Sequence, residues 1–383
     1  MRRIIICLIA LVLALGFFPA AVRAEGSFVV DEDEDTPDLK HQARAMMQRM
    51  TDEQKIYQLF FVTVEDLTGE SRSVALPDEN VFLKYPVGGV ILFGQNIESE
   101  EQLRALTQAL SSQASKAGLY PLFLGVDEEG GLVSRVANKL GYRLAMSPEE
   151  IGASGNEALA YSAGRQIAAY LAPLGINMTF APSLDTWIDQ EKIGVQTYGS
   201  DPKLVSRMAS HMASGLRDGG LLPCFGHFPG HGTKDGTLLS NIGIPRTLDD
   251  MRTLEWLPFQ DMIDEDAEMI LISHGKVSIM GEDVHTSMSY AMISNILRGQ
   301  MGFQGVVVTD SLRMNAITSN YKKGQESVAA LKAGADLLLL PPDLDKAVAA
   351  IRAALSSGEL TMARIEESVE RILAVKIRMS AIR

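Results

Sequence analysis

The sequence predicts an α/β protein with a single domain, a (β/α)8 barrel of the TIM type. Short apolar runs rich in β-branched residues alternate with longer amphipathic segments, a pattern typical of β-α units around a parallel sheet. Eight such runs occur in one chain of 383 residues, which indicates a closed barrel. An open doubly wound sheet is the alternative, but the glycine fingerprint of a dinucleotide site does not follow the first run.

The predicted elements alternate along the chain. Strands are expected at Tyr57–Val64, Val87–Phe93, Leu122–Val126, Asn177–Ala181, Leu221–Phe225, Ala267–Ser273, Gly305–Thr309 and Ala335–Leu340. The spacing of apolar residues predicts helices at Ser99–Ala117, Asn156–Leu171, Pro202–Asp218, Leu248–Asp264, Gln325–Ala333 and Asp343–Ser380.

The N-terminus has the three parts of a secretory signal. A basic start precedes an apolar run from Ile4 to Phe18 and a small-residue cleavage site. The run is shorter than the roughly 20 residues that a membrane-spanning helix needs, although an uncleaved N-terminal anchor is the alternative. We therefore predict a signal peptide at residues 1–24, an acidic disordered stretch at 25–38 and the barrel at 39–383.

Composition narrows the classes of partner. Outside the predicted signal, Cys224 is the only cysteine, so the exported chain must be held together by its core rather than by an internal disulfide. The formal net charge of −13 argues against binding to nucleic acid or anionic lipid. We expect a protein of the periplasm, the cell envelope or the medium, with no membrane contact beyond the signal or an N-terminal anchor.

Polar residues at the strand ends predict where the functional site lies, because the working residues of a β/α barrel follow its strands. These residues are Glu65, Asn96, Asp127, Glu129, Asp185, His227, His274 and Asp310. Carboxylates and imidazoles that converge on one mouth suit acid/base or nucleophilic chemistry on a polar ligand. Taken singly, each has a structural alternative, such as an aspartate that caps the next helix.

Three segments go beyond this general pattern. The first, 125–135, reads GVDEEGGLVSR and delivers a carboxylate into a Gly-Gly turn. The second, 226–232, reads GHFPGHG, and the third, 302–314, reads GFQGVVVTDSLRM. Together with INMTFAP at 176–182, they resemble the barrel domain of glycoside hydrolase family 3, and most of all its bacterial β-N-acetylhexosaminidases. The resemblance spans roughly residues 40 to 340.

The resemblance implies roles for individual residues. Asp310 falls on the catalytic nucleophile, which attacks the anomeric carbon, so that the reaction would retain the anomeric configuration. Asp127, Arg135 and His227 fall on residues that bind the sugar. Glu129 and His231 fall on positions that support the site. The implied ligand is a carbohydrate, an N-acetylhexosaminide or a cell-wall fragment, and no cofactor is expected.

The departures from the family pattern concern the acid/base and several cationic sugar contacts. Thr237–Leu239 replace the family's Asp-Ser-His, whose histidine is the general acid/base. Gly226 and Leu132 replace a lysine and an arginine, and Gln196 takes the place of a sugar-binding arginine. Asp235 is the nearest carboxylate that can substitute as the acid, although an aspartate before glycine is most often a turn residue.

Two readings of function remain open. The first is an exported β-N-acetylhexosaminidase-like glycosidase, and the second is a sugar-binding or scaffolding protein that has lost catalysis. Retention of Asp310 and Asp127 favours the first, and the missing acid/base dyad favours the second. A metal site is not expected, because Pro229-Gly230 breaks any helix that would place His227 and His231 on one face.

Overall fold

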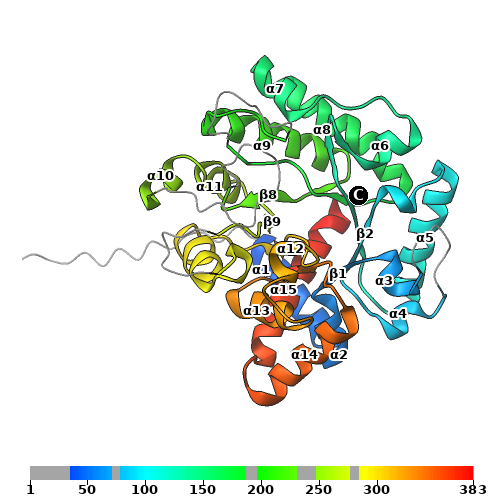
Figure 1. The fold of residues 1–383 in the computed structure, drawn as a ribbon. Helices are drawn as coiled ribbons and strands as arrows, with labels where there is room; N and C mark the ends of the chain where they lie inside the picture. Colours follow the sequence, from blue (N-terminus) through cyan, green and yellow to red (C-terminus); the bar gives the residue numbers. More distant parts are fainter. Residues whose placement is uncertain (1–34, 71–77, 187–195, 231–246, 277–283, 383) are drawn as a thin grey trace, which may run out of the picture.

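The computed structural model of the chain describes residues 35–70, 78–186, 196–230, 247–276 and 284–382, and it confirms the barrel (Figure 1). Its strands are β1 (Phe60–Thr63), β2 (Gly89–Leu92), β3 (Phe123–Val126), β6 (Met178–Thr179), β7 (Leu222–Pro223), β8 (Phe225–Phe228), β9 (Met269–Ile272), β10 (Val306–Thr309) and β11 (Leu338–Leu339), with a short antiparallel pair, β4 (Glu128–Gly130) and β5 (Val133–Ser134).

Parallel pairing runs in two arcs, β11-β1-β2-β3-β6-β7 and β8-β9-β10. Bridges between Ser183 and Gly226 and between Val308 and Leu337 join the arcs, which closes the barrel. Every residue of β1, β2, β3, β9 and β10 is buried, as expected for parallel strands that are covered on both faces.

Helices surround the strands (Figure 1). They are α1 (Asp35–Met47), α2 (Asp52–Gln58), α3 (Val64–Thr68), α4 (Val81–Lys84), η1 (Gly94–Asn96), α5 (Glu100–Lys116), α6 (Arg135–Leu140), α7 (Pro148–Ser154), α8 (Glu157–Leu171), η2 (Ala172–Leu174), α9 (Pro202–Asp218), α10 (Leu248–Thr253), α11 (Leu257–Asp264), η4 (Thr286–Met288), η5 (Ala291–Gln300), α12 (Asn315–Thr318), α13 (Gln325–Ala333), α14 (Leu344–Ser357) and α15 (Met362–Ala381).

All eight predicted strands are present, most of them shorter than predicted, and two of the boundary differences have a clear structural reason. The first begins at Phe60 rather than Tyr57, because a capping box at Thr51 starts helix α2, which extends to Gln58. The fifth continues past Cys224 as β8, so His227 lies within the strand and not after it.

Two predicted helices are each divided into two. The segment expected as Leu248–Asp264 forms α10 and α11. The terminal segment, expected as Asp343–Ser380, forms α14 and α15: Gly358, with φ of 78°, ends α14, and Thr361 caps the start of α15. Helix α1 begins at Asp35, inside the stretch 25–38 that was predicted to be disordered. The predicted signal at 1–24 lies outside the described residues.

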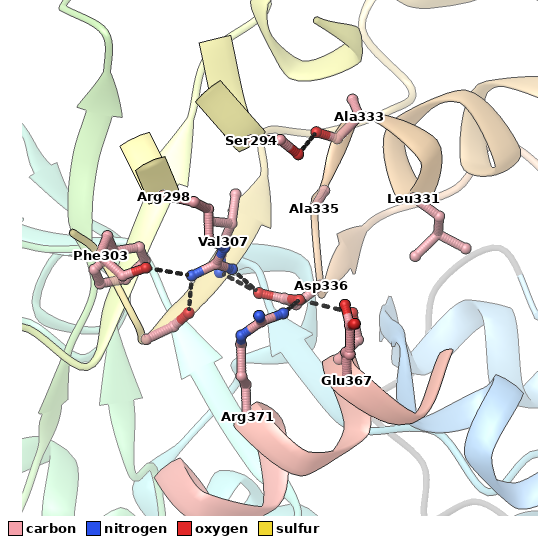
Figure 2. Close-up of polar contacts among 12 residues, drawn as sticks. Ser294, Arg298, Phe303, Val307, Leu331, Ala333, Ala335, Asp336, Glu367 and Arg371 are labelled. Atoms are coloured by element: carbon pink, nitrogen blue, oxygen red, sulfur yellow. Dashed lines mark hydrogen bonds and ion pairs between the residues drawn. The ribbon is translucent and has the colours of Figure 1, made fainter. Parts of the chain in front are cut away.

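Helix α15 covers the N-terminal ends of the strands and carries part of a buried charge cluster (Figure 2). Asp336 is fully buried, and its carboxylate accepts hydrogen bonds from Ser368 Oγ at 2.7 Å, Arg371 Nη1 at 3.0 Å and the backbone N–H of Val307 at 3.0 Å. Arg298 also pairs with it, and Arg364 lies 3.7 Å away. Burial alone would raise the pKa of Asp336, but the three guanidinium groups hold it below its ordinary value.

Lys376 of α15 is also fully buried. Its Nζ donates to Gln58 Oε1 at 2.8 Å and lies 5.0 Å from the centre of the Phe123 ring. Because no carboxylate pairs with it among the described residues, burial lowers the pKa of Lys376 to about 7. The protein therefore holds a buried amine that is expensive to charge.

Replacing Lys376 with methionine is expected to stabilise the protein by about 2–4 kcal/mol at pH 7. Lys376 has a pKa of 10.5 in the unfolded protein and about 7 in the folded one, so between these pH values only the unfolded state binds the proton. The native protein therefore loses stability as the pH falls from 10.5 to 7. The gain in the variant should shrink towards pH 10.5. Urea unfolding at pH 7 and pH 10 measures the gain in free energy of unfolding, with the exposed change Lys116→Met as the control. An equal gain at both pH values would contradict the role of the lowered pKa of Lys376.

Candidate functional site

The structure brings the predicted polar residues to one rim of the barrel. Asp127 follows β3, His227 lies near the end of β8, and Asp310 follows β10. These strands run parallel around the closed barrel, so their C-terminal ends share one rim, and Asp127 and His227 both lie within electrostatic reach of Asp310. This juxtaposition is what the sequence predicts.

Asp127 is held by the Gly-Gly turn and by Arg135. Gly130 and Gly131 have φ of 95° and 57°, and a Cβ at Gly130 would lie 2.4 Å from the carbonyl oxygen of Met146, so this turn requires glycine. Arg135 Nη2 lies 3.5 Å from Asp127 Oδ2. Burial raises the pKa of Asp127, while Arg135 acts against the rise.

His227 forms an ion pair with Asp185. Its Nδ1 lies 2.9 Å from Asp185 Oδ2, which also accepts a hydrogen bond from Ser183 Oγ at 3.1 Å. Burial alone would lower the pKa of His227, but Asp185, and then Asp310, raise it to about 9. His227 is therefore an imidazolium at neutral pH. The sequence predicts Asp185 at the rim, but it does not indicate the pairing with His227, which is 42 residues away.

Asp310 has one oxygen fixed and one without a partner. Its Oδ1 accepts a hydrogen bond from the backbone N–H of Ser311 at 2.6 Å, and its own N–H donates to Ile272 at 2.8 Å. Its Oδ2 is buried and has no hydrogen-bond partner among the described residues. A carboxylate held in this way at a barrel mouth can attack an electrophilic carbon without reorienting.

His274 supports the same segment from the end of β9. Its Nε2 lies 2.9 Å from the carbonyl oxygen of Ser311, and its Nδ1 lies 2.7 Å from Ser287 Oγ. Burial lowers the pKa of His274, while Asp310 acts against the change. Because both ring nitrogens have protein partners, His274 fixes the backbone beside Asp310.

Gln196 contacts Glu129. Its Nε2 donates to Glu129 Oε1 at 3.0 Å, and Glu129 Oε2 is buried with no hydrogen-bond partner in the described part of the chain. Burial raises the pKa of Glu129 to about 7. Gln196, which takes the place of the family's arginine, thus donates a hydrogen bond from its amide to the carboxyl group of Glu129.

Other predicted site residues lie outside the described residues: Asp235, His231 and Thr237–Leu239. Leu132, at the tip of the turn, is 72% exposed. Within the described ranges, no group of three or more histidine, cysteine, aspartate or glutamate side chains is arranged to hold a metal ion. No helix in these ranges is long and apolar enough to cross a membrane.

The fold places carboxylates and a charged histidine at the mouth of a barrel, where the functional site of such a fold lies, and comparison with known proteins identifies the family. The model of the glycosyl hydrolase family 3 N-terminal domain matches residues 51–375. The chain therefore belongs to glycosyl hydrolase family 3, as its motifs predict.

The most similar relatives include hexosaminidases. "Beta-hexosaminidase LpqI" of Mycobacterium tuberculosis is 31% identical over 336 residues, which cover 84% of this chain and 82% of the relative. "Beta-hexosaminidase A" of Pseudoalteromonas piscicida is 29% identical over 347 residues, 82% of this chain and 57% of the relative. A family 3 β-N-acetylglucosaminidase from Paenibacillus has a similar structure, with a TM-score of 0.80 and 33% identity over 86% of this chain and 63% of that one. The chain thus spans little more than half of some relatives.

Proposed function

We propose that this chain is a retaining glycoside hydrolase of the β-N-acetylhexosaminidase type, with Asp310 as its nucleophile. The observation that carries the proposal is the Asp310 carboxylate, which has Oδ1 fixed by Ser311 and Oδ2 without a partner among the described residues. A retaining glycosidase needs such a group to form a covalent glycosyl-enzyme. The names of the hexosaminidase relatives support the sugar class.

Binding of the sugar is assigned to the residues around Asp310. Asp127, oriented by Arg135, offers a carboxylate to sugar hydroxyls, and His227 offers a charged N–H donor, a strong type of hydrogen bond. Gln196 belongs to the same site through Glu129. The substrate class is an N-acetylhexosaminide of the cell wall or an oligosaccharide. The signal-like N-terminus supports an exported protein.

Protonation of the leaving group is the step for which this chain lacks the family's residue. Asp235 is the proposed acid, and it takes the place of the histidine that the family carries near Leu239. General acid catalysis is typically worth about 10²–10⁴-fold, so the identity of the acid matters most for substrates with poor leaving groups. For a substrate whose leaving group departs without a proton, Asp310 alone suffices to form the glycosyl-enzyme. Hydrolysis of that intermediate still needs a base that takes a proton from water, a role that the same acid residue takes in retaining enzymes.

A panel of aryl N-acetyl-β-glucosaminides with leaving groups of different pKa tests this proposal. Activated glycosides are expected to turn over readily, and alkyl glycosides are expected to lag. Asp235→Asn should lower kcat/KM for the alkyl glycosides by about 10²-fold or more and leave kcat/KM for the activated ones unchanged, because kcat/KM reports formation of the glycosyl-enzyme. An equal effect of Asp235→Asn on both classes would contradict its role. If the whole panel is inert and the protein still binds N-acetylglucosamine by calorimetry, the second reading, a non-catalytic sugar-binding protein, replaces the first.

A further inference from the structure

Glu129 lies in the proposed sugar site, but its carboxyl group lacks the partners that a buried carboxylate needs. It is 6% exposed, and its single hydrogen bond in the described chain is the one from Gln196 Nε2 to Oε1 at 3.0 Å. No lysine or arginine of the described residues pairs with it, and Oε2 has no donor. A buried carboxylate with one neutral donor and no direct ion pair is more costly than its protonated form, although the nearby charge of His227 acts against the rise in its pKa.

Contacts on both sides hold the backbone at Glu129. Glu128 is anchored on the other side of the strand, where it accepts hydrogen bonds from the N–H groups of Val136 at 2.8 Å and Ala137 at 3.1 Å and from Tyr170 Oη at 2.7 Å. On the following side, a Cβ at Gly131 would lie 2.6 Å from Ser147 Cβ, so the turn packs closely against its neighbour. Glu129 is therefore fixed in place.

The charges around Glu129 indicate its position in the site. His227, Asp127 and Asp185 act on it most strongly, and Asp310 is not among these groups. His227, by contrast, interacts more strongly with Asp310 than with Glu129. Glu129 and Asp310 therefore both lie within electrostatic reach of His227.

We propose that Glu129 is a positioning residue that is protonated in the sugar-bound state, holds the Gln196 side chain through their hydrogen bond, and couples sugar binding to the uptake of a proton. The inference rests on the proposed function, since it assigns the sugar to this rim. A bound sugar excludes water from the rim and further disfavours the unpartnered carboxylate. Binding therefore draws Glu129 towards its protonated form.

The pH range of the effect follows from the groups that face Glu129. Burial raises the pKa of Glu129 to about 7, so its proton is exchanged near neutral pH. His227, whose pKa is raised to about 9, stays protonated between pH 6 and 8. Asp127 has Arg135 as a counter-ion, Asp185 is paired with His227, and burial raises the pKa of Tyr198 far above this range. Burial also raises the pKa of Asp127, so Asp127 and Glu129 are the two carboxyl groups here whose protonation can respond to binding, and the Glu129→Gln variant separates them.

Calorimetry with N-acetyl-D-glucosamine from pH 6 to pH 8, in two buffers of different ionisation enthalpy, tests the inference. The native protein should take up a fraction of a proton near pH 7 and bind about three- to tenfold more weakly at pH 8 than at pH 6. Glu129→Gln, which mimics the protonated form, should bind with pH-independent affinity and no proton uptake. Gln196→Arg should also remove the uptake, because its guanidinium stabilises the carboxylate. Glu101→Gln, an exposed change of the same kind, should behave as the native protein.

Three outcomes separate the possible failures. Proton uptake that persists in Glu129→Gln would overturn the inference, as would native binding that does not depend on pH. Absence of binding by the native protein at every pH would overturn the proposed function together with the positioning role. In that case, urea unfolding still reports the protonation state of Glu129. Because its pKa is raised from 4.5 to about 7 in the folded protein, the free energy of unfolding should decrease as the pH rises from 4.5 to 7. Glu129→Gln should abolish this decrease.

Discussion

Asp310→Asn is expected to lower kcat/KM for every glycoside by about 10³–10⁵-fold, because an amide cannot attack the anomeric carbon or leave it again. The change is isosteric, and the hydrogen bond from the backbone N–H of Ser311 to the side-chain oxygen can be kept. Folding and sugar affinity should therefore change little. Steady-state kinetics with an activated aryl N-acetyl-β-glucosaminide measures the loss.

Two controls make the Asp310 result specific. The thermal unfolding midpoint of Asp310→Asn should stay close to that of the native protein, and its affinity for N-acetylglucosamine should stay within about threefold, less than 1 kcal/mol. Activity that remains above a tenth of the native value in a contaminant-free preparation would exclude Asp310 as the nucleophile and leave another rim carboxylate, such as Asp127, to be tested.

Asp336→Asn is expected to lower the free energy of unfolding by about 3–5 kcal/mol, because it removes one partner of a buried ion cluster. The side chains of Arg298, Arg364 and Arg371 are only 13%, 18% and 25% exposed, so the guanidinium groups would remain largely desolvated without a counter-ion (Figure 2). The cluster joins η5, the start of β11 and α15. Its loss should therefore loosen the N-terminal end of the barrel.

Urea unfolding compares Asp336→Asn with a matched surface change. Asp249 pairs with Arg252 at 3.1 Å but is 89% exposed, so Asp249→Asn should cost less than about 1 kcal/mol. The cost of Asp336→Asn should diminish at low pH. Because the pKa of Asp336 is lowered in the folded protein, its charge stabilises the native state at pH values above 3.8, the pKa in the unfolded protein. This stabilisation is lost as the pH falls through the native pKa. Equal costs for the two variants would contradict the role of the cluster.

The strands and the rim were predictable because both depend on local pattern. Buried parallel strands read as apolar runs, and polar residues directly after them must face one rim, so Asp127 and Asp310 are recognisable from sequence. The boundary at Tyr57 was missed because its apolar run continues from α2 into β1 without a break.

The buried charges were not predictable, because they depend on contacts between distant segments. Arg371 and Lys376 lie on an amphipathic helix, where a charged residue normally faces solvent. Only the packing of α15 against the barrel buries Lys376 and covers most of Arg371. Likewise, the pairing of His227 with Asp185 joins two strand ends, and the raised pKa of Glu129 follows from a partner, Gln196, whose position no periodicity indicates.

Trapping of the covalent intermediate tests the central claim most directly. The native protein is incubated with an activated glycoside whose ring carries fluorine, which slows breakdown of the glycosyl-enzyme, and its intact mass is compared with that of Asp310→Asn. If Asp310 is the nucleophile, the native protein gains the mass of one glycosyl group, located on Asp310 by peptide mapping, and the variant gains none. An adduct on another residue, or turnover of activated substrates without any adduct on Asp310, would contradict it.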